Sequence, residues 1–168
     1  MALAAYLTGT SLPAYREILR FIWNCSHASL LDAVEGDCRV VRRMLRSARF
    51  EHRLSGHFSV YRGVRGCGIG MAAKGLSWTL NRDVACWFAH RPGKGALLVA
   101  TATIDASDIV YHSDTRNEAE VVLRRQVRAD LDPEPATWQT AAKRQERRIY
   151  HSEMVPCWFP RFARARGI

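Results

Sequence analysis

The chain has 168 residues, a mass of 19.0 kDa and 48% hydrophobic residues, which suits one domain whose core needs neither disulfides nor metals. No apolar run approaches a bilayer span, and the apolar N-terminus lacks the basic leader of a secretory signal, so we expect a cytoplasmic protein with no membrane partner. The net charge of +9 comes almost wholly from arginine, which excludes a predominantly acidic protein and favours planar anionic partners.

Five cysteines, an odd number with no C-x-x-C pair, predict neither a disulfide framework nor a structural zinc site. We therefore expect no metal. The basic charge gathers toward the C-terminus, where nine arginines and one lysine fall between Arg124 and Arg166. A polyanionic or acidic partner and a solvated basic face explain this count equally well.

The first fifty residues are predicted to be helical and to serve as packing scaffold. Ser11 can cap a helix that has Pro13 in its first turn and apolar residues at helical spacing. A second helix is expected from near Ser29 or Asp32 to about Arg46.

From residue 58 the pattern changes to short β-prone runs. Residues 58–61 predict a strand that ends at Arg62-Gly63, and a glycine-rich loop leads to a second strand over 76–79. Asn81 is expected to cap a helix that continues to Ala89.

The remaining elements alternate in the same way. Further strands are expected over 96–104, 108–111 and 118–123, with a polar loop at 112–117, an amphipathic helix at 136–149 and an irregular or strand-like end at 155–168. Helices followed by a strand-rich body predict a single α+β domain over residues 1–168.

Three short polar motifs lie in these strand-like runs: Tyr61-Arg62-Gly63, Ser77-Trp78-Thr79 and Glu118-Ala119-Glu120. Polar groups are costly in elements expected to bury apolar surface. Cleavage of a nicotinamide–ribose bond needs an anion near the cation-like ribose, a group that orients this anion, a cation for the phosphates and a close-approaching glycine backbone. These four needs match Glu120, Ser77, Arg62 and Gly63.

On these residues the sequence resembles the ADP-ribosyltransferase fold family, in its arginine–serine–glutamate branch. The family places an arginine at the end of a strand, then a Ser-x-Ser or Ser-x-Thr strand motif, an Ala-x-x-Phe-Ala helix and a Glu-x-Glu motif. Here these are Arg62, residues 77–79, residues 85–89 and residues 118–120. The resemblance covers the middle third to half of the chain, and Trp78 is bulkier than the usual residue at its position.

The resemblance implies that Glu120 is the catalytic carboxylate, that Ser77 orients it and that Arg62 binds the NAD phosphates. Gly63 would hold the nicotinamide amide through its backbone, and Thr79 would support the strand motif. The nearest candidates for a ring that stacks on nicotinamide are the aromatic residues Trp78, Trp87 and Phe88.

Glu118 would assist the nucleophile of the acceptor as a base, and the loop 112–117 would recognise that acceptor. The implied fold is a split β-sandwich core, with a helical segment at 1–50, an NAD-binding catalytic core at 58–125 and a basic C-terminal segment with a helix at 126–168. The implied activity is NAD-dependent mono-ADP-ribosyl transfer, with NAD as substrate and no metal.

The acceptor is expected to be a protein side chain, arginine first, with nucleic acid second because of the basic C-terminal third. Small proteins of this kind are often phage or bacterial effectors that act in a host cytoplasm. NAD hydrolysis is a further possibility. A non-catalytic module that binds nucleic acid or an acidic protein through its arginines remains the alternative, with Trp138, Trp158 and Phe159 as stacking residues.

The glycine-rich segment 66–70 also resembles a phosphate-binding loop. It lacks the third glycine of G-x-G-x-x-G, because position 71 is methionine, and no Gly-Lys-Ser/Thr follows. We therefore expect a flexible loop near the NAD. No histidine belongs to a metal-spaced set, and His112 is expected to be the only one near the site.

Overall fold

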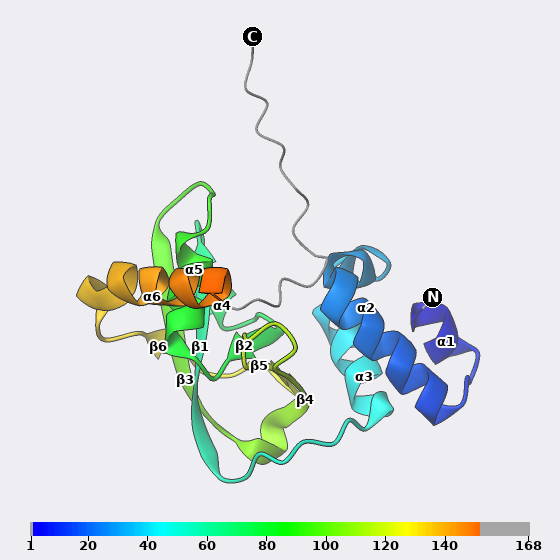
Figure 1. Ribbon diagram of the computed structural model, residues 1–168. Coiled ribbons are helices and arrows are strands. Elements are labelled where there is room, and N and C mark those ends of the chain that lie inside the picture. The colour runs from blue at the N-terminus through cyan, green and yellow to red at the C-terminus, as the bar shows by residue number, and fades with distance from the viewer. Residues whose placement is uncertain (1, 152–168) are drawn as a thin grey trace.

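The computed structural model describes residues 2–151 of the chain and shows an α+β protein (Figure 1). These residues form six α-helices and one antiparallel sheet of six strands. The expected α+β class is confirmed. The predicted segment 155–168, with Trp158 and Phe159, lies outside the described residues.

Three helices open the chain: α1 (Ala2–Leu7), α2 (Leu12–Asp32) and α3 (Cys38–Ala48). The predicted start of a second helix at Ser29 or Asp32 is wrong, because α2 continues to Asp32 across a kink at Ser26 (φ −160°, ψ 54°). Helix α3 begins only after Asp37, whose carboxylate accepts a hydrogen bond from the Arg39 N–H at 2.8 Å. Gly36, at φ +77°, supplies the left-handed turn between the two helices.

The sheet has the strand order β4-β5-β2-β1-β3-β6. Its strands are β1 (His57–Arg65), β2 (Ser77–Thr79), β3 (Leu97–Asp105), β4 (Ile109–Ser113), β5 (Glu120–Leu123) and β6 (Asp130–Leu131). Strands β1 and β3 pair along their full length, whereas β1 and β2 pair at one position, Tyr61 opposite Thr79. The sheet therefore narrows at its middle into two three-stranded halves.

Two predicted strand boundaries are wrong. Strand β1 does not end at Arg62-Gly63, because pairing with β3 continues to Arg65 opposite Leu97. Strand β5 starts at Glu120 rather than Glu118, because Ala119 adopts a φ of +44°, which extended backbone cannot include.

The other helices cover the sheet on the side of β1 and β3. The glycine-rich segment contains the short α4 (Ile69–Ala72), and α5 (Arg82–His90) starts where expected, with the Asn81 side chain accepting from the Asp83 N–H at 2.9 Å. Helix α6 (Trp138–His151) follows a 3₁₀ turn at Pro135–Thr137 and packs on α5 (Figure 1).

The N-terminal helices form a layer beside the β4 edge of the sheet (Figure 1). Leu19, Trp23 and Met44 are fully or almost fully buried in one cluster with Tyr111 of β4 and Val122 of β5. This cluster fixes the helical layer against the half of the sheet that carries β5.

Helix α5 lies against β1 so closely that one position accepts only glycine. A Cβ built on Gly63 would lie 1.7 Å from the Ala85 carbonyl oxygen and 2.7 Å from the Ala89 nitrogen. Both are backbone atoms of α5, so neither can move aside alone.

Replacing Gly63 with alanine is therefore expected to destabilise the protein by about 1–3 kcal/mol, as overpacking does in other cores. Urea unfolding of wild type and Gly63→Ala measures this loss. The matched control is Gly70→Ala in α4, where an added Cβ meets nothing within 4 Å, and where alanine should add about 0.5–1 kcal/mol of helix stability. Equal stability of the two variants would contradict the tight contact between β1 and α5.

Candidate active site

A cavity of about 280 Å³ lies between the helical layer and the narrow middle of the sheet. Eight of the predicted site residues line it: Arg62, Gly63, Ser77, Trp78, Thr79, Phe88, Glu118 and Glu120. They come from β1, β2, α5, β5 and the loop before β5, so the fold brings together residues as far apart as positions 62 and 120. The cavity also includes Trp23, His27, Leu31, Cys38, Tyr61, Gly75, Leu76 and Arg116.

The Glu120 carboxylate is the most constrained group of the cavity. The residue is 7% exposed, and its Oε1 accepts a short hydrogen bond from the Ser77 hydroxyl. Its Oε2 accepts from the Trp23 indole N–H at 3.1 Å and from Arg116 Nη2 at 3.2 Å. Three donors from three segments thus hold one buried carboxylate in a single orientation.

Register explains why Ser77 reaches Glu120. Strands β2 and β5 are antiparallel, with Ser77 opposite Val122 and Thr79 opposite Glu120. Ser77 and Glu120 are therefore diagonal neighbours on adjacent strands, within reach of a hydroxyl and a long carboxylate side chain.

Thr79, two residues further along β2, forms hydrogen bonds with the backbone around the site rather than with the Glu120 side chain. Its hydroxyl donates to the Glu118 carbonyl at 2.5 Å and accepts from the Asn81 N–H at 2.9 Å. Ser77 therefore positions the carboxylate of Glu120, whereas Thr79 positions the chain just before it.

Arg62 is a cation held in the cavity wall without a direct counter-ion. Its Nη1 donates a short hydrogen bond to the Ser77 carbonyl, and its Nε is buried with no partner among residues 2–151. No described carboxylate forms an ion pair with it, and burial lowers the pKa of its guanidinium. Gly75 makes room for the group, since a Cβ there would lie 2.2 Å from Arg62 Cζ. A half-buried guanidinium that forms no ion pair and lies beside a cavity suits an anionic ligand.

Glu118 stands on a loop held in a sparsely populated conformation. Asn117 (φ 55°) and Ala119 (φ 44°) flank it in the left-handed region, which costs of order 1–3 kcal/mol for a residue with a Cβ. Two hydrogen bonds fix Ala119: its N–H donates to Asp114 Oδ1 at 3.1 Å, and its carbonyl accepts from the Leu80 N–H at 3.0 Å. The loop therefore presents Glu118 to the cavity in a defined position.

The Glu118 carboxylate lies 2.8 Å from Arg116 Nη2, the same nitrogen that contacts Glu120. Burial raises the pKa of Glu118, and the nearby Glu120 adds to this, while Arg116 opposes it. The net shift is upward, so Glu118 holds a proton more readily than an exposed glutamate.

The N-terminal helical layer also supplies residues to the cavity. Trp23, His27 and Leu31 lie one helical turn apart on α2 and form one wall of the cavity. The expectation that His112 is the only histidine near the site is wrong, since His27 lines the cavity and His112 belongs to β4 opposite Val121. Burial lowers the pKa of His27, which favours its neutral form.

Two of the three proposed stacking rings reach the cavity. Trp78 and Phe88 line it, although Trp78 is only 2% exposed. Trp87 does not line it. Its ring lies 5.0 Å from that of Phe88, and the Arg91 guanidinium lies 4.7 Å above it. Tyr61, which the sequence did not single out, also lines the cavity.

Within residues 2–151 no group of three or more His, Cys, Asp or Glu side chains is arranged to hold a metal ion. Burial raises the pKa of the Cys86 thiol to about 11, so this cysteine is not a thiolate at neutral pH. In the same part of the chain no helix is both long and apolar enough to cross a membrane.

Comparisons with protein-family models, with curated proteins and with solved structures found no match to this chain. The chemistry of the cavity is therefore inferred from the residues that line it.

The raised pKa of Glu118 predicts a pH-dependent effect of Glu118→Gln. A raised carboxyl pKa contributes stability that is present below the ordinary value of 4.5 and is lost as pH rises through the folded-state value. The variant should thus be more stable than wild type at pH 7, with the difference vanishing near pH 4. Urea unfolding at both pH values measures this.

Glu134→Gln is the matched control, because that side chain is 64% exposed and its replacement should change stability little at either pH. A Glu118→Gln variant less stable than wild type at pH 7 would show that the contact with Arg116 outweighs the cost of burial.

Proposed function

We propose that this protein is an NAD-dependent mono-ADP-ribosyltransferase that transfers ADP-ribose to a macromolecular acceptor. The observation that supports it best is the meeting of Arg62, Ser77 and Glu120 in one cavity, with the Glu120 carboxylate fixed by three donors. These are the residues on which the resemblance to the arginine–serine–glutamate branch depends.

In this proposal the bond between ribose C1′ and the nicotinamide nitrogen breaks, and nicotinamide leaves as a neutral molecule with the bonding electron pair. The ribose becomes cation-like, and the fixed Glu120 carboxylate stabilises that charge without having to reorient. Ser77, Trp23 and Arg116 are positioning residues, because they hold Glu120 in place.

The acceptor nucleophile then forms a bond to C1′, and its proton passes to Glu118. The structure supports this assignment in two ways. Glu118 lines the cavity beside Glu120, and its raised pKa suits a group that takes up a proton. Water in place of the acceptor would give NAD hydrolysis.

Arg62 is assigned to the NAD phosphates, since it is a guanidinium without an anionic partner at the cavity wall. A cavity of about 280 Å³ lies at the lower limit for small-molecule sites. It can therefore enclose the nicotinamide riboside part of NAD, with the rest at its mouth. Gly63, Trp78 and Phe88 would contact the nicotinamide.

The sheet is consistent with the split β-sandwich that this activity implies. Its two halves, β6-β3-β1 and β2-β5-β4, meet at the single pair Tyr61–Thr79. The proposed site lies at this junction, where Arg62 belongs to one half and Ser77 and Glu120 belong to the other.

The acceptor proposed first is a protein side chain, arginine in particular, because Glu118 occupies the first glutamate of the Glu-x-Glu motif. The proposed setting is a phage or bacterial effector in a host cytoplasm. Neither assignment is needed for the cleavage of NAD, which is the step to test first.

Glu120→Gln is expected to lower nicotinamide release from NAD by roughly 100- to 1,000-fold, because a neutral amide no longer stabilises the ribose cation. Release is measured by chromatography in the presence of candidate acceptor proteins. The matched control is Glu51→Gln, on an exposed residue of the connection between α3 and β1, which should behave as wild type.

Equal release by wild type and Glu120→Gln, or none by either, would refute the enzyme and favour the non-catalytic binding module. That module predicts binding to nucleic acid or an acidic protein that weakens steeply with salt and does not depend on Glu120. Intact-mass measurement of the acceptors separates transfer, which leaves an adduct, from hydrolysis.

Arg62→Gln is expected to weaken NAD binding about tenfold or more, since it removes charge-assisted hydrogen bonds to phosphate. Calorimetry in the Glu120→Gln background measures binding without turnover. Arg43→Gln, on an exposed arginine of α3, is the control for the loss of one positive charge. The same affinity in both arginine variants would remove Arg62 from the NAD site.

A further inference from the structure

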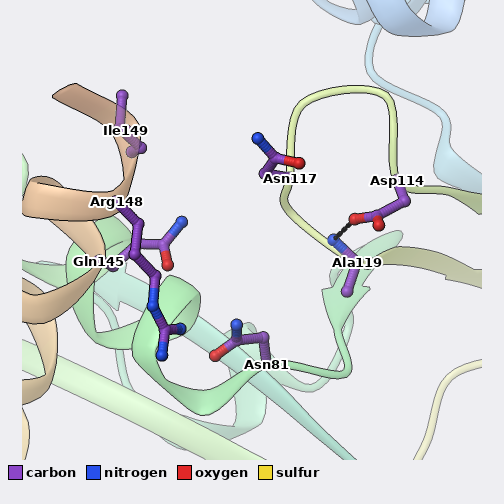
Figure 2. Close-up of a pocket in the computed structure, with 7 residues that line it drawn as sticks. All are labelled: Asn81, Asp114, Asn117, Ala119, Gln145, Arg148 and Ile149. Carbon is purple, nitrogen blue, oxygen red and sulfur yellow. Dashed lines mark hydrogen bonds between the residues drawn. The ribbon is translucent and has the colours of Figure 1, made fainter. Parts of the chain in front are cut away.

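A second cavity of about 350 Å³ lies between α6 and the loop that carries Glu118. Figure 2 shows α6 on one side, the loop on the other and Asn81 at the floor. The lining residues are Asn81, Asp114, Asn117, Ala119, Gln145, Arg148 and Ile149. None of them lines the first cavity, although the loop is common to both.

The strongest pointer to a ligand is Gln145. This residue is 2% exposed, and its Oε1 is buried with no hydrogen-bond partner in the described part of the chain. Its amide points away from α6 into the cavity (Figure 2). Buried polar atoms are nearly always hydrogen-bonded, so this unpaired acceptor is the feature of the cavity that most favours a ligand with a hydrogen-bond donor.

Two more carboxamides face the same space. The Asn81 Oδ1 is already used, because it accepts from the Asp83 N–H at 2.9 Å, and the amide nitrogen points upward into the cavity (Figure 2). Asn117 reaches in from the loop on the other side (Figure 2). The cavity therefore offers amide donors and an amide acceptor on facing walls.

A carboxamide pairs well with an adenine edge, where an amino group lies beside a ring-nitrogen acceptor. Single bases are read in this way on their Watson–Crick and Hoogsteen edges. The side chains of Ala119 and Ile149 provide apolar surface on opposite sides of the opening (Figure 2), which suits the faces of a base.

Charge around the cavity favours a nucleotide over an uncharged amide ligand. Helix α6 exposes Lys143, Arg144, Arg147 and Arg148 along this part of its length. Arg148 lines the cavity, and its Nη1 lies 3.6 Å from Asp83 Oδ2. Arg144 Nη1 also contacts this carboxylate, at 3.1 Å. Against these four basic residues stand three carboxylates: Asp83, Asp114 in the cavity wall and the exposed Glu146 of α6. One positive charge is therefore left for a phosphate.

We propose that this second cavity binds an adenine base that carries phosphate, with Gln145 Oε1 accepting from the exocyclic amino group and Arg148 facing the phosphate. The source is either a free adenine nucleotide or an unpaired adenine of a nucleic acid. This site is separate from the proposed NAD cavity, and its existence does not depend on transferase activity.

The test measures binding of AMP and of inosine monophosphate by calorimetry to the full chain. Inosine monophosphate carries an oxygen in place of the amino group, so it presents an acceptor to the Gln145 oxygen. We expect AMP to bind at least about tenfold more tightly. Equal affinity for the two nucleotides, or no binding of AMP and of oligoadenylate alike, would overturn the proposal.

Gln145→Met keeps the size of the side chain and removes its acceptor. It is expected to weaken AMP binding about tenfold or more, whereas Gln139→Met, on an exposed residue of the same helix, should leave binding unchanged. Thermal unfolding checks that both variants are folded. Undiminished AMP binding by a folded Gln145→Met variant would overturn the assignment.

Two further binding measurements show which cavity AMP occupies and whether the natural ligand is a free nucleotide or a nucleic acid. Nicotinamide mononucleotide lacks adenine and should not displace AMP, so displacement would place AMP in the first cavity and overturn the proposal. Single-stranded oligoadenylate that binds more tightly than AMP and more tightly than oligouridylate would identify nucleic acid as the source. Tighter binding of AMP would identify a free nucleotide.

Discussion

The burial of the Glu120 carboxylate is the constraint on which the rest of this structure depends. An ionised carboxylate taken out of water is costly unless donors surround it. Here those donors come from α2, from β2 and from the loop before β5. The helical layer, the sheet and the loop must therefore be assembled together before this group is satisfied, which makes the cavity a product of the whole fold.

A buried arginine and a half-buried one make similar contacts with backbone carbonyls. Arg42 of α3 donates to the carbonyls of Lys74, Gly75 and Leu123, all at 3.1–3.3 Å. Arg62 of β1 donates to the carbonyl of Ser77. The segment that delivers Ser77 to the cavity is thus held through its carbonyl oxygens by one cation from the helical layer and one from the sheet. Glycine at position 75 leaves room for the Arg62 guanidinium.

Much of this could be predicted from local sequence, and the failures have physical reasons. The start of α5 is predicted correctly from Asn81, because an N-cap interacts only with residues next to it in the sequence. The predicted end of β1 is too early because Arg62 and Gly63 interrupt the apolar pattern, whereas pairing with β3, 32 or more residues away in the sequence, continues the strand. The role of Trp23 could not be predicted, since it depends on a carboxylate 97 positions distant. Ala119 adopts a positive φ, which keeps Glu118 out of β5. An alanine in the sequence gives no indication of such a conformation.

The loop from Asp114 to Ala119 divides its side chains between two cavities. Arg116 and Glu118 line one of them, and Asp114, Asn117 and Ala119 line the other. A ligand that moved this loop from one side would change affinity on the other, by a factor equal in both directions. The two hydrogen bonds that fix Ala119 hold both sets of side chains in place at once. A ligand beside α6 that moved the loop would therefore also move Glu118 and Arg116 relative to Glu120.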